Sequence, residues 1–133
     1  MTPRFADTSY YLAVLGPTDV HHAKAVALSR VKRARYVTTE YVLLEVGNAL
    51  HRSADRGLFV ALVAGLSVSP TTTILPASAD LWQRGNALYA ARPDKDWSLT
   101  DCISFVVMGE LGLTDALTAD HHFAQAGFTP LLA

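Results

Sequence analysis

The sequence has little of several features that mark specialised classes of protein. Its 133 residues include a single cysteine, Cys102, which excludes an internal disulfide and is typical of a reducing compartment. No apolar run approaches the ~18 residues that a membrane-spanning helix requires. At the N-terminus a charged residue, Arg4, precedes any apolar run, unlike the pattern of a signal peptide. We therefore expect a cytoplasmic protein that does not associate with membranes.

Charge is also scarce, because charged residues make up only 17% of the chain and the formal net charge is −1. The chain as a whole is therefore not a polycation that coats nucleic acid. The densest basic run, residues 30–35, has two interpretations: a solvated helix end that complements the helix dipole, which we favour, or a contact to RNA. Half of the residues are hydrophobic, which predicts a compact core in one domain spanning residues 1–133.

Turn signals and apolar periodicity predict strands that alternate with helices. The expected strands cover residues 4–6, 36–38, 72–75, 115–118 and 129–132. The expected helices cover residues 10–15, 18–34, 39–56, 58–66, 78–91, 98–111 and 120–126. In the second of these helices the residues expected to face inward are Val20, Ala23, Ala27 and Val31. This order indicates an α/β fold of three layers, with a mainly parallel sheet of four to five strands flanked by helices.

Four acidic residues stand where this fold places ligands, at the carboxyl ends of parallel strands. Asp7 and Asp120 follow the first and the fourth expected strand. At 100° per residue, Glu45 lies at the rim of the buried stripe of its helix. Asp101 lies in the first turn of a helix that is apolar nearly all round, where an unpaired carboxylate costs several kcal/mol. A metal ion shared by these acids would resolve that cost.

Each acid also has a purely structural interpretation. Asp7 and Asp120 are in position to cap helices, Asp101 to form a capping box with Ser98, and Glu45 to be a solvated charge. The convergence of all four on one end of one sheet favours the metal site. The roles of two further acids, Asp96 and Asp115, are left open.

Four stretches of the chain carry a resemblance to a known family: residues 5–9, 39–50, 99–105 and 116–128. Their ordered Asp, Glu, Thr-Asp and Thr-x-Asp-x-x-Phe pattern resembles PIN domains, and among them the VapC-like ribonuclease toxins of toxin–antitoxin pairs. The resemblance covers the whole chain. It implies that the catalytic, metal-binding acids are Asp7, Glu45, Asp101 and Asp120. It assigns supporting polar positions to Thr8, Ser9, Thr100 and Thr118.

The resemblance implies a metal-dependent endoribonuclease that cleaves RNA phosphodiester bonds with Mg²⁺ or Mn²⁺. It also implies a separately encoded antitoxin that occludes the site, and a homodimer or a higher toxin–antitoxin assembly. Three alternatives remain at this point: an RNA-maturation nuclease, a non-catalytic module with the same fold, and a signalling receiver domain with an acidic Mg²⁺ site.

The histidines do not indicate zinc, since side chains at neighbouring helical positions point about 100° apart. His121 or His122 could nevertheless contact substrate near Asp120. We expect the thiol of Cys102 and the indoles of Trp82 and Trp97 to serve as packing groups.

Overall fold

The structure, a computed structural model, describes residues 2–133, which form one five-stranded sheet. Its strands are β1 (Arg4–Ala6), β2 (Tyr36–Thr39), β3 (Thr72–Leu75), β4 (Asp115–Leu117) and β5 (Thr129–Pro130). They lie in the order β3-β2-β1-β4-β5, and every neighbouring pair is parallel. The predicted parallel sheet is confirmed. The order differs from the 2-1-3-4-5 order of receiver domains, so that alternative is wrong.

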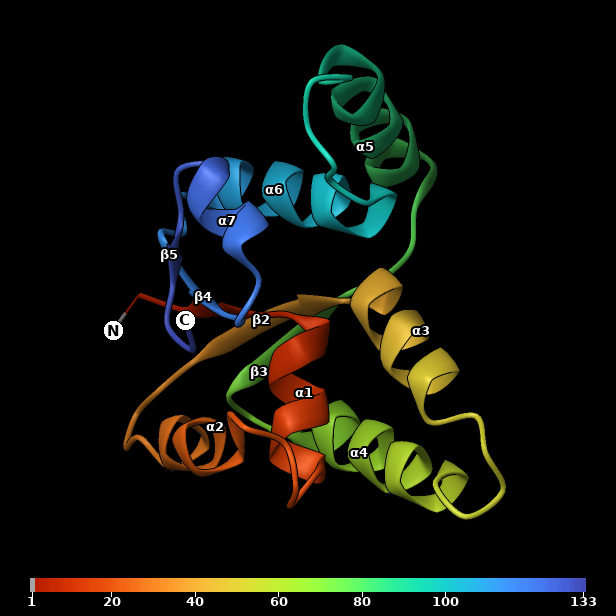
Figure 1. The fold of residues 1–133 in the computed structure, drawn as a ribbon, viewed down its shortest axis with the longest axis vertical. Helices are drawn as coiled ribbons and strands as arrows, with labels where there is room; N and C mark the ends of the chain where they lie inside the picture. The colour runs from red at the N-terminus through yellow and green to blue at the C-terminus, as the bar shows by residue number, and fades with distance from the viewer. Residues whose placement is uncertain (1) are drawn as a thin grey trace.

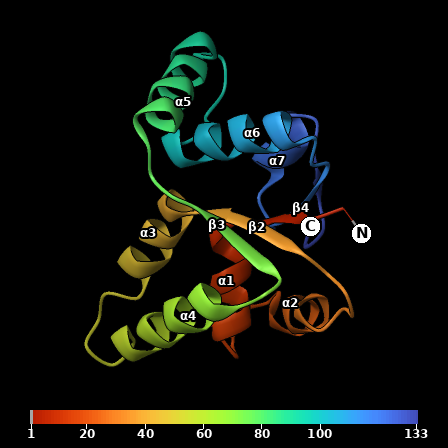
Figure 2. The same cartoon turned by 180° about the vertical axis from the view of Figure 1, so that it is seen from behind.

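Within residues 2–133 the sheet is covered by seven helices. They are α1 (Thr8–Leu15), α2 (His22–Ser29), α3 (Glu40–Ala49), α4 (Arg56–Val68), α5 (Ala79–Ala91), α6 (Leu99–Leu111) and α7 (His121–Gln125). Figures 1 and 2 show α5, α6 and α7 on one face of the sheet and α1, α2 and α4 on the other. The three-layer arrangement is therefore confirmed.

The core lies between β1, β4 and the interior helix α6. Phe5 is fully buried in β1, and Ile103 and Met108 are buried on α6 together with Cys102. Aromatic rings join α6 to α7, because Phe105 meets Phe123 edge to face with ring centroids 4.9 Å apart. The predicted interior position of this helix, and the packing role of Cys102, are confirmed.

The predicted helix over residues 18–34 is wrong in both length and orientation. Asp19 Oδ1 accepts the backbone N–H of His21 at 2.8 Å and closes a turn, so that α2 begins only at His22. The chain has left the helix by Arg33, whose φ is 62°. Of the residues expected to face inward, Val20 is 89% exposed, Ala23 and Ala27 are exposed, and Val31 is half-buried.

The predicted helix over residues 39–56 ends earlier than expected, whereas the predicted helix over residues 58–66 is confirmed as α4. The first of these helices begins as expected, with Thr39 Oγ1 accepting the N–H of Val42, but α3 ends at Ala49 and α4 begins at Arg56. Folding α4 back brings Phe59 against Gly47, where an added Cβ would lie 3.1 Å from the phenyl ring. Burial of that ring outweighs helix continuity, and Gly57, expected to end the helix, lies inside α4.

The remaining differences are small. The first helix begins at Thr8 rather than Tyr10, and the last two strands end at Leu117 and Pro130. Trp82 is 50% exposed, so its predicted packing role is wrong, whereas Trp97 is buried as expected. None of the helices described in residues 2–133 combines the length and apolar character needed to cross a lipid bilayer.

Candidate active site

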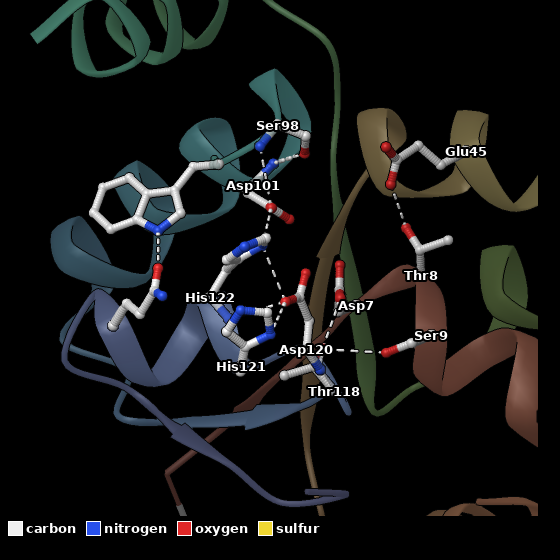
Figure 3. A network of polar contacts seen from close by, with 12 residues as sticks. Asp7, Thr8, Ser9, Glu45, Ser98, Asp101, Thr118, Asp120, His121 and His122 are labelled. Atoms are coloured by element: carbon white, nitrogen blue, oxygen red, sulfur yellow. Dashed lines mark hydrogen bonds and ion pairs between the residues drawn. The ribbon is translucent and has the colours of Figure 1, made fainter. Parts of the chain in front are cut away.

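The four predicted acids converge on one cleft at the carboxyl end of the sheet (Figure 3). Asp7 follows β1, Asp120 follows β4, Glu45 projects from α3 and Asp101 from α6. The cleft is open to solvent and has a volume of about 360 Å³. It is lined by Asp7, Thr8, Ser9, Leu12, Glu45, Asp96, Ser98, Asp101, Asp120 and His122.

Asp7 is the most deeply buried of these acids, with an exposure of 5%. Asp7 occupies the N-cap position of α1, as its structural interpretation expected, but its side chain makes no capping hydrogen bond to the helix. The pKa of Asp7 is raised to about 7, chiefly by burial and to a smaller extent by the carboxylates of Asp101 and Glu45, while two hydrogen bonds lower it. Without a counter-charge, this acid therefore exchanges a proton near neutral pH.

Thr118 is the centre of the hydrogen-bond network that holds Asp7. Its hydroxyl donates to Asp7 Oδ2 at 2.8 Å and accepts the N–H of Asp120 at 3.0 Å. Because that single proton goes to Asp7, the 3.1 Å contact with Ser9 requires the Ser9 hydroxyl to donate. Ser9 Oγ in turn accepts the N–H of Ala119 at 3.1 Å. The network fastens the β1–α1 junction to the β4–α7 junction.

Asp101 serves as a helix cap and as a wall of the cleft. Its N–H donates to Ser98 Oγ at 3.0 Å, and its Oδ2 accepts the N–H of Ser98 at 3.2 Å, which completes a capping box. Burial raises the pKa of Asp101, as does the neighbouring Asp120, while Ser98 opposes the shift. The capping-box interpretation of this residue is therefore confirmed, and the same cap fixes the orientation of the carboxylate at the cleft. Its role as a metal ligand stays a prediction.

Glu45 is half-buried at the opposite wall, where the rim of the α3 stripe was expected to place it. The hydroxyl of Thr8 donates to Glu45 Oε1 at 2.7 Å. This bond joins α1 to α3 and orients the carboxylate towards the cleft (Figure 3).

Asp120 caps α7 through the N–H of His122, which donates to Oδ1 at 2.9 Å. The imidazole of His122 lies between two acids, with Nδ1 3.1 Å from Asp120 Oδ1 and 3.6 Å from Asp101 Oδ2. That buried nitrogen makes no hydrogen bond within the described chain. The first turn of α7 tilts the rings of His121 and His122 together, with centroids 4.2 Å apart, so the expected divergence of this pair is wrong.

The sequence identified His122 only as a residue near Asp120. The signal for its position is the cap itself, since an Asp that binds the N–H two residues later draws that residue towards its own carboxylate. Asp96, left open in the sequence, lines the cleft. Asp115 begins β4 and lies at the other end of the sheet. The side chain of Thr100 enters none of the hydrogen bonds that the structure describes, and its supporting role stays a prediction.

The basic run of residues 30–35 lies away from this cleft. It leads into the amino end of β2, where the N–H of Arg4 donates to the carbonyl of Arg35 at 2.9 Å. Asp7 and Asp120 follow the carboxyl ends of β1 and β4, at the opposite end of the sheet. The run therefore fits its interpretation as a solvated segment better than a contact to RNA at the cleft.

The model of the PIN domain family matches residues 4–129. The chain belongs to the PIN domain family. Among its relatives is the 23S rRNA-specific endonuclease VapC20 from two strains of Mycobacterium tuberculosis, CDC 1551 / Oshkosh and ATCC 25618 / H37Rv. Each is 29% identical over 124 residues, which cover 93% of this chain and 94% of the relative.

A crystal structure of Mycobacterium tuberculosis VapC20, described as a sarcin–ricin loop cleaving toxin, superimposes on this PIN domain with a TM-score of 0.84. The two sequences are 28% identical, and the match covers 94% of this chain and 95% of that one. The likeness therefore extends over nearly the whole length of both chains.

The donor set of this PIN domain suits a hard divalent cation. Carboxylate oxygens from four separate elements face the cleft, and no lysine or arginine is among the described residues that line it. Oxygen donors of this kind match Mg²⁺ and Mn²⁺. Burial raises the pKa of Asp7, and a bound cation would favour its ionised form.

Proposed function

We propose that this chain is a metal-dependent endoribonuclease that hydrolyses RNA phosphodiester bonds at the cleft of Asp7, Glu45, Asp101 and Asp120. The observation that carries the proposal is the convergence of these four carboxylates without a lining cation. Support comes from VapC20, which is named an rRNA endonuclease and resembles this chain over almost its whole length.

In this proposal Asp7, Glu45 and Asp101 hold Mg²⁺ or Mn²⁺, and Asp120 binds a second ion or orients the attacking water. A cation held there supplies Lewis-acid activation and neutralises phosphate charge. The chain's own residues prepare the site. Thr118 donates to Asp7 Oδ2 and favours its ionised form, Ser98 fixes the rotamer of Asp101, and Thr8 orients Glu45.

His122 faces Asp101 and Asp120 through Nδ1. An N–H at that position weakens the mutual repulsion of the two carboxylates and can hold a proton beside the reacting groups. Its contribution is therefore to electrostatics and proton transfer at the wall opposite Glu45.

We further infer that residues 1–133 work as one domain that acts as the toxin of a toxin–antitoxin pair on a structured ribosomal RNA. The antitoxin then occludes the cleft, and the assembly contains a homodimer or a higher oligomer. This inference is supported by the description of VapC20 as a sarcin–ricin loop cleaving toxin.

The test is cleavage of a panel of structured RNAs, including a sarcin–ricin loop hairpin, by purified chain freed of any co-purifying partner. We expect cutting with Mg²⁺ or Mn²⁺ but not with chelator, and products with 5′-phosphate and 3′-hydroxyl ends. Asp7→Asn should reduce the rate at least about 100-fold, whereas Asp115→Asn, at the other end of the sheet, should leave it unchanged.

Three outcomes would contradict the proposal. Cutting that survives chelation or Asp7→Asn indicates another mechanism or a contaminant. Products with 2′,3′-cyclic phosphate ends exclude attack by water. An absence of cutting across the panel moves the interpretation to a non-catalytic module.

A further inference from the structure

A second hollow borders the acidic cleft and has a larger volume, about 480 Å³. Its wall includes Tyr89 from the end of α5, Lys95 and Asp96 from the segment between α5 and α6, and Cys102 from α6. Asp96 lines both hollows, and Cys102 directly follows Asp101 along α6. The two hollows are therefore neighbours that share Asp96 and are lined by consecutive residues of α6.

The charged groups of this hollow differ from those of the cleft, because two cations, Arg92 and Lys95, line it beside a single acid, Asp96. The guanidinium of Arg92 is already neutralised, with Nε and Nη2 each 3.0 Å from an oxygen of Asp94, and it lies 5.0 Å from the ring centroid of Trp97. Lys95 forms no ion pair with any residue in the range 2–133. Its ammonium is half-exposed and has no direct ion-pair partner there, although the carboxylate of Asp94 interacts with it at longer range.

The segment that carries Lys95 is held rigidly with respect to the acids. Trp97 is 6% exposed, its Nε1–H donates to Gln125 Oε1 at 3.0 Å, and its ring meets Phe105 edge to face at 5.0 Å. The next residue, Ser98, forms the capping box with Asp101. These contacts position the segment of Lys95 relative to Asp101.

We propose that this hollow is a nucleotide subsite for the RNA strand, in which Lys95 binds a phosphate neighbouring the scissile one and Tyr89 stacks on a base. The inference rests on the proposed function. A strand whose scissile phosphate lies among four carboxylates gains affinity from a cation on the adjoining phosphate. Tyr89 is 54% exposed at the wall, which leaves its ring accessible to a base.

Asp96, on the shared rim, determines which part of a bound nucleotide lies at the rim and which part lies at Lys95. A carboxylate repels phosphate but accepts a hydrogen bond from a ribose 2′-hydroxyl, the group that distinguishes RNA from DNA. The arrangement therefore places sugar at the rim and phosphate at Lys95.

The test measures binding of a fluorescein-labelled sarcin–ricin loop RNA hairpin by anisotropy, in Mg²⁺ and over a range of salt. It uses an Asp7→Asn background, so that the RNA is not cut. Lys95→Gln should raise the Kd roughly 5- to 10-fold at about 0.1 M salt and reduce the slope of log K against log salt by about 1. Lys32→Gln, a matched loss of charge at the opposite end of the sheet, should change neither quantity.

The aromatic part is tested by two substitutions of Tyr89. Tyr89→Ala should weaken binding about fivefold or more, while Tyr89→Phe, which keeps the ring, should retain the affinity of the parent. In the active chain, Lys95→Gln should raise KM and leave kcat within about twofold. Thermal melting of each variant checks that the fold is retained.

Equal effects of Lys95→Gln and Lys32→Gln, or no effect of either, overturn the subsite, because the attraction is then diffuse or located elsewhere. Equal losses from Tyr89→Phe and Tyr89→Ala overturn the stacking contact. If the Lys95→Gln chain cleaves RNA with an unchanged KM, the subsite is overturned and the proposed function stands. If the chain binds RNA through Lys95 but never cuts it, the proposed function is overturned and the subsite stands.

Discussion

The two ends of the parallel sheet differ sharply in the sign of their charge and in its exposure to water. At the carboxyl end, the described cleft gathers the four predicted carboxylates and Asp96 without a lining lysine or arginine, and Asp7 has a pKa of about 7. At the amino end, the basic run of residues 30–35 precedes β2. Its four arginine and lysine side chains are exposed to water.

This difference shows at which end of the sheet charge destabilises the folded chain in the absence of a ligand. Exposed cations at the amino end cost little, because water and salt screen them. Buried acids at the carboxyl end cost stability unless a ligand from outside supplies positive charge. The chain does not neutralise its own site, although it has cations enough to do so. This is the pattern expected where function, rather than stability, determines the placement of charge.

The largest expected effect is on the stability of the metal-free chain. Asp7→Asn should raise the free energy of unfolding at about pH 8 by up to ~4 kcal/mol, the equivalent of moving a carboxyl pKa from its ordinary value to about 7. Urea unfolding in the presence of chelator measures this change. Asp115→Asn, at the other end of the sheet, should lie within about 0.5 kcal/mol of the parent. Equal effects of the two substitutions would remove the contrast between the ends.

The same acid makes stability depend on pH. Between about pH 4 and pH 7, the folded chain keeps a proton on Asp7 that the unfolded chain has lost, because its folded pKa is raised. The free energy of unfolding should therefore fall as pH rises through this window and level off above about pH 7. In Asp7→Asn that decline should be smaller.

The next largest expected effect is on metal binding, which should depend on the acids at the carboxyl end of the sheet and not on the cations at the amino end. A cation displaces the proton of Asp7. The apparent affinity of the chain for the cation should therefore increase, by up to about tenfold for each unit of rising pH, until about pH 7. Calorimetric titration with Mn²⁺ in buffers of different ionisation enthalpy measures both affinity and proton release. A pH-independent affinity with no released proton would show that Asp7 is not a ligand. Lys32→Gln should leave the titration unchanged.

Thr118→Val tests whether the hydrogen-bond network matters beyond packing. Valine keeps the shape of the buried side chain but removes the donor to Asp7 Oδ2. The pKa of Asp7 should rise further, so cleavage at neutral pH should fall about tenfold and its pH profile should move to higher pH. Thr118→Ser should restore the profile. Thr129→Val, on an exposed residue at the amino end of β5, is the matched control, and an equal loss there would indicate a general effect on folding.

The positions of the acids could be predicted from sequence where a simple geometric rule applies. Asp7 and Asp120 follow strands, and parallel strands bring their carboxyl ends to one edge. Asp101 could be placed because its helix is apolar on all sides and is therefore interior. Sequence reasoning treated capping and cleft-lining as alternatives for this residue. The structure shows one carboxylate in both positions, since the N-terminal turn of α6 faces the cleft.

The rest depended on contacts between segments far apart in the chain. The early end of α3 at Ala49 goes with the packing of Phe59 on Gly47, whereas sequence reasoning placed the boundary between these two helices at Gly57. His122 approaches Asp101 only because α7 packs beside α6, a relation that the spacing of residues cannot reveal. The hollow at Lys95 likewise depends on where Trp97 anchors the segment after α5.

The smallest expected effect is at the amino end. Arg33 has a φ of 62°, a left-handed conformation that costs a residue with a side chain about 1–2 kcal/mol. Glycine adopts this conformation without strain but loses more backbone entropy on folding, so Arg33→Gly should raise the free energy of unfolding by only about 0.5 kcal/mol. Urea unfolding measures the stability, and cleavage of the hairpin should remain unchanged. A loss of cleavage in this variant would mean that the basic run takes part in RNA binding. In that case the cations at the amino end and the acids at the carboxyl end would both act on RNA.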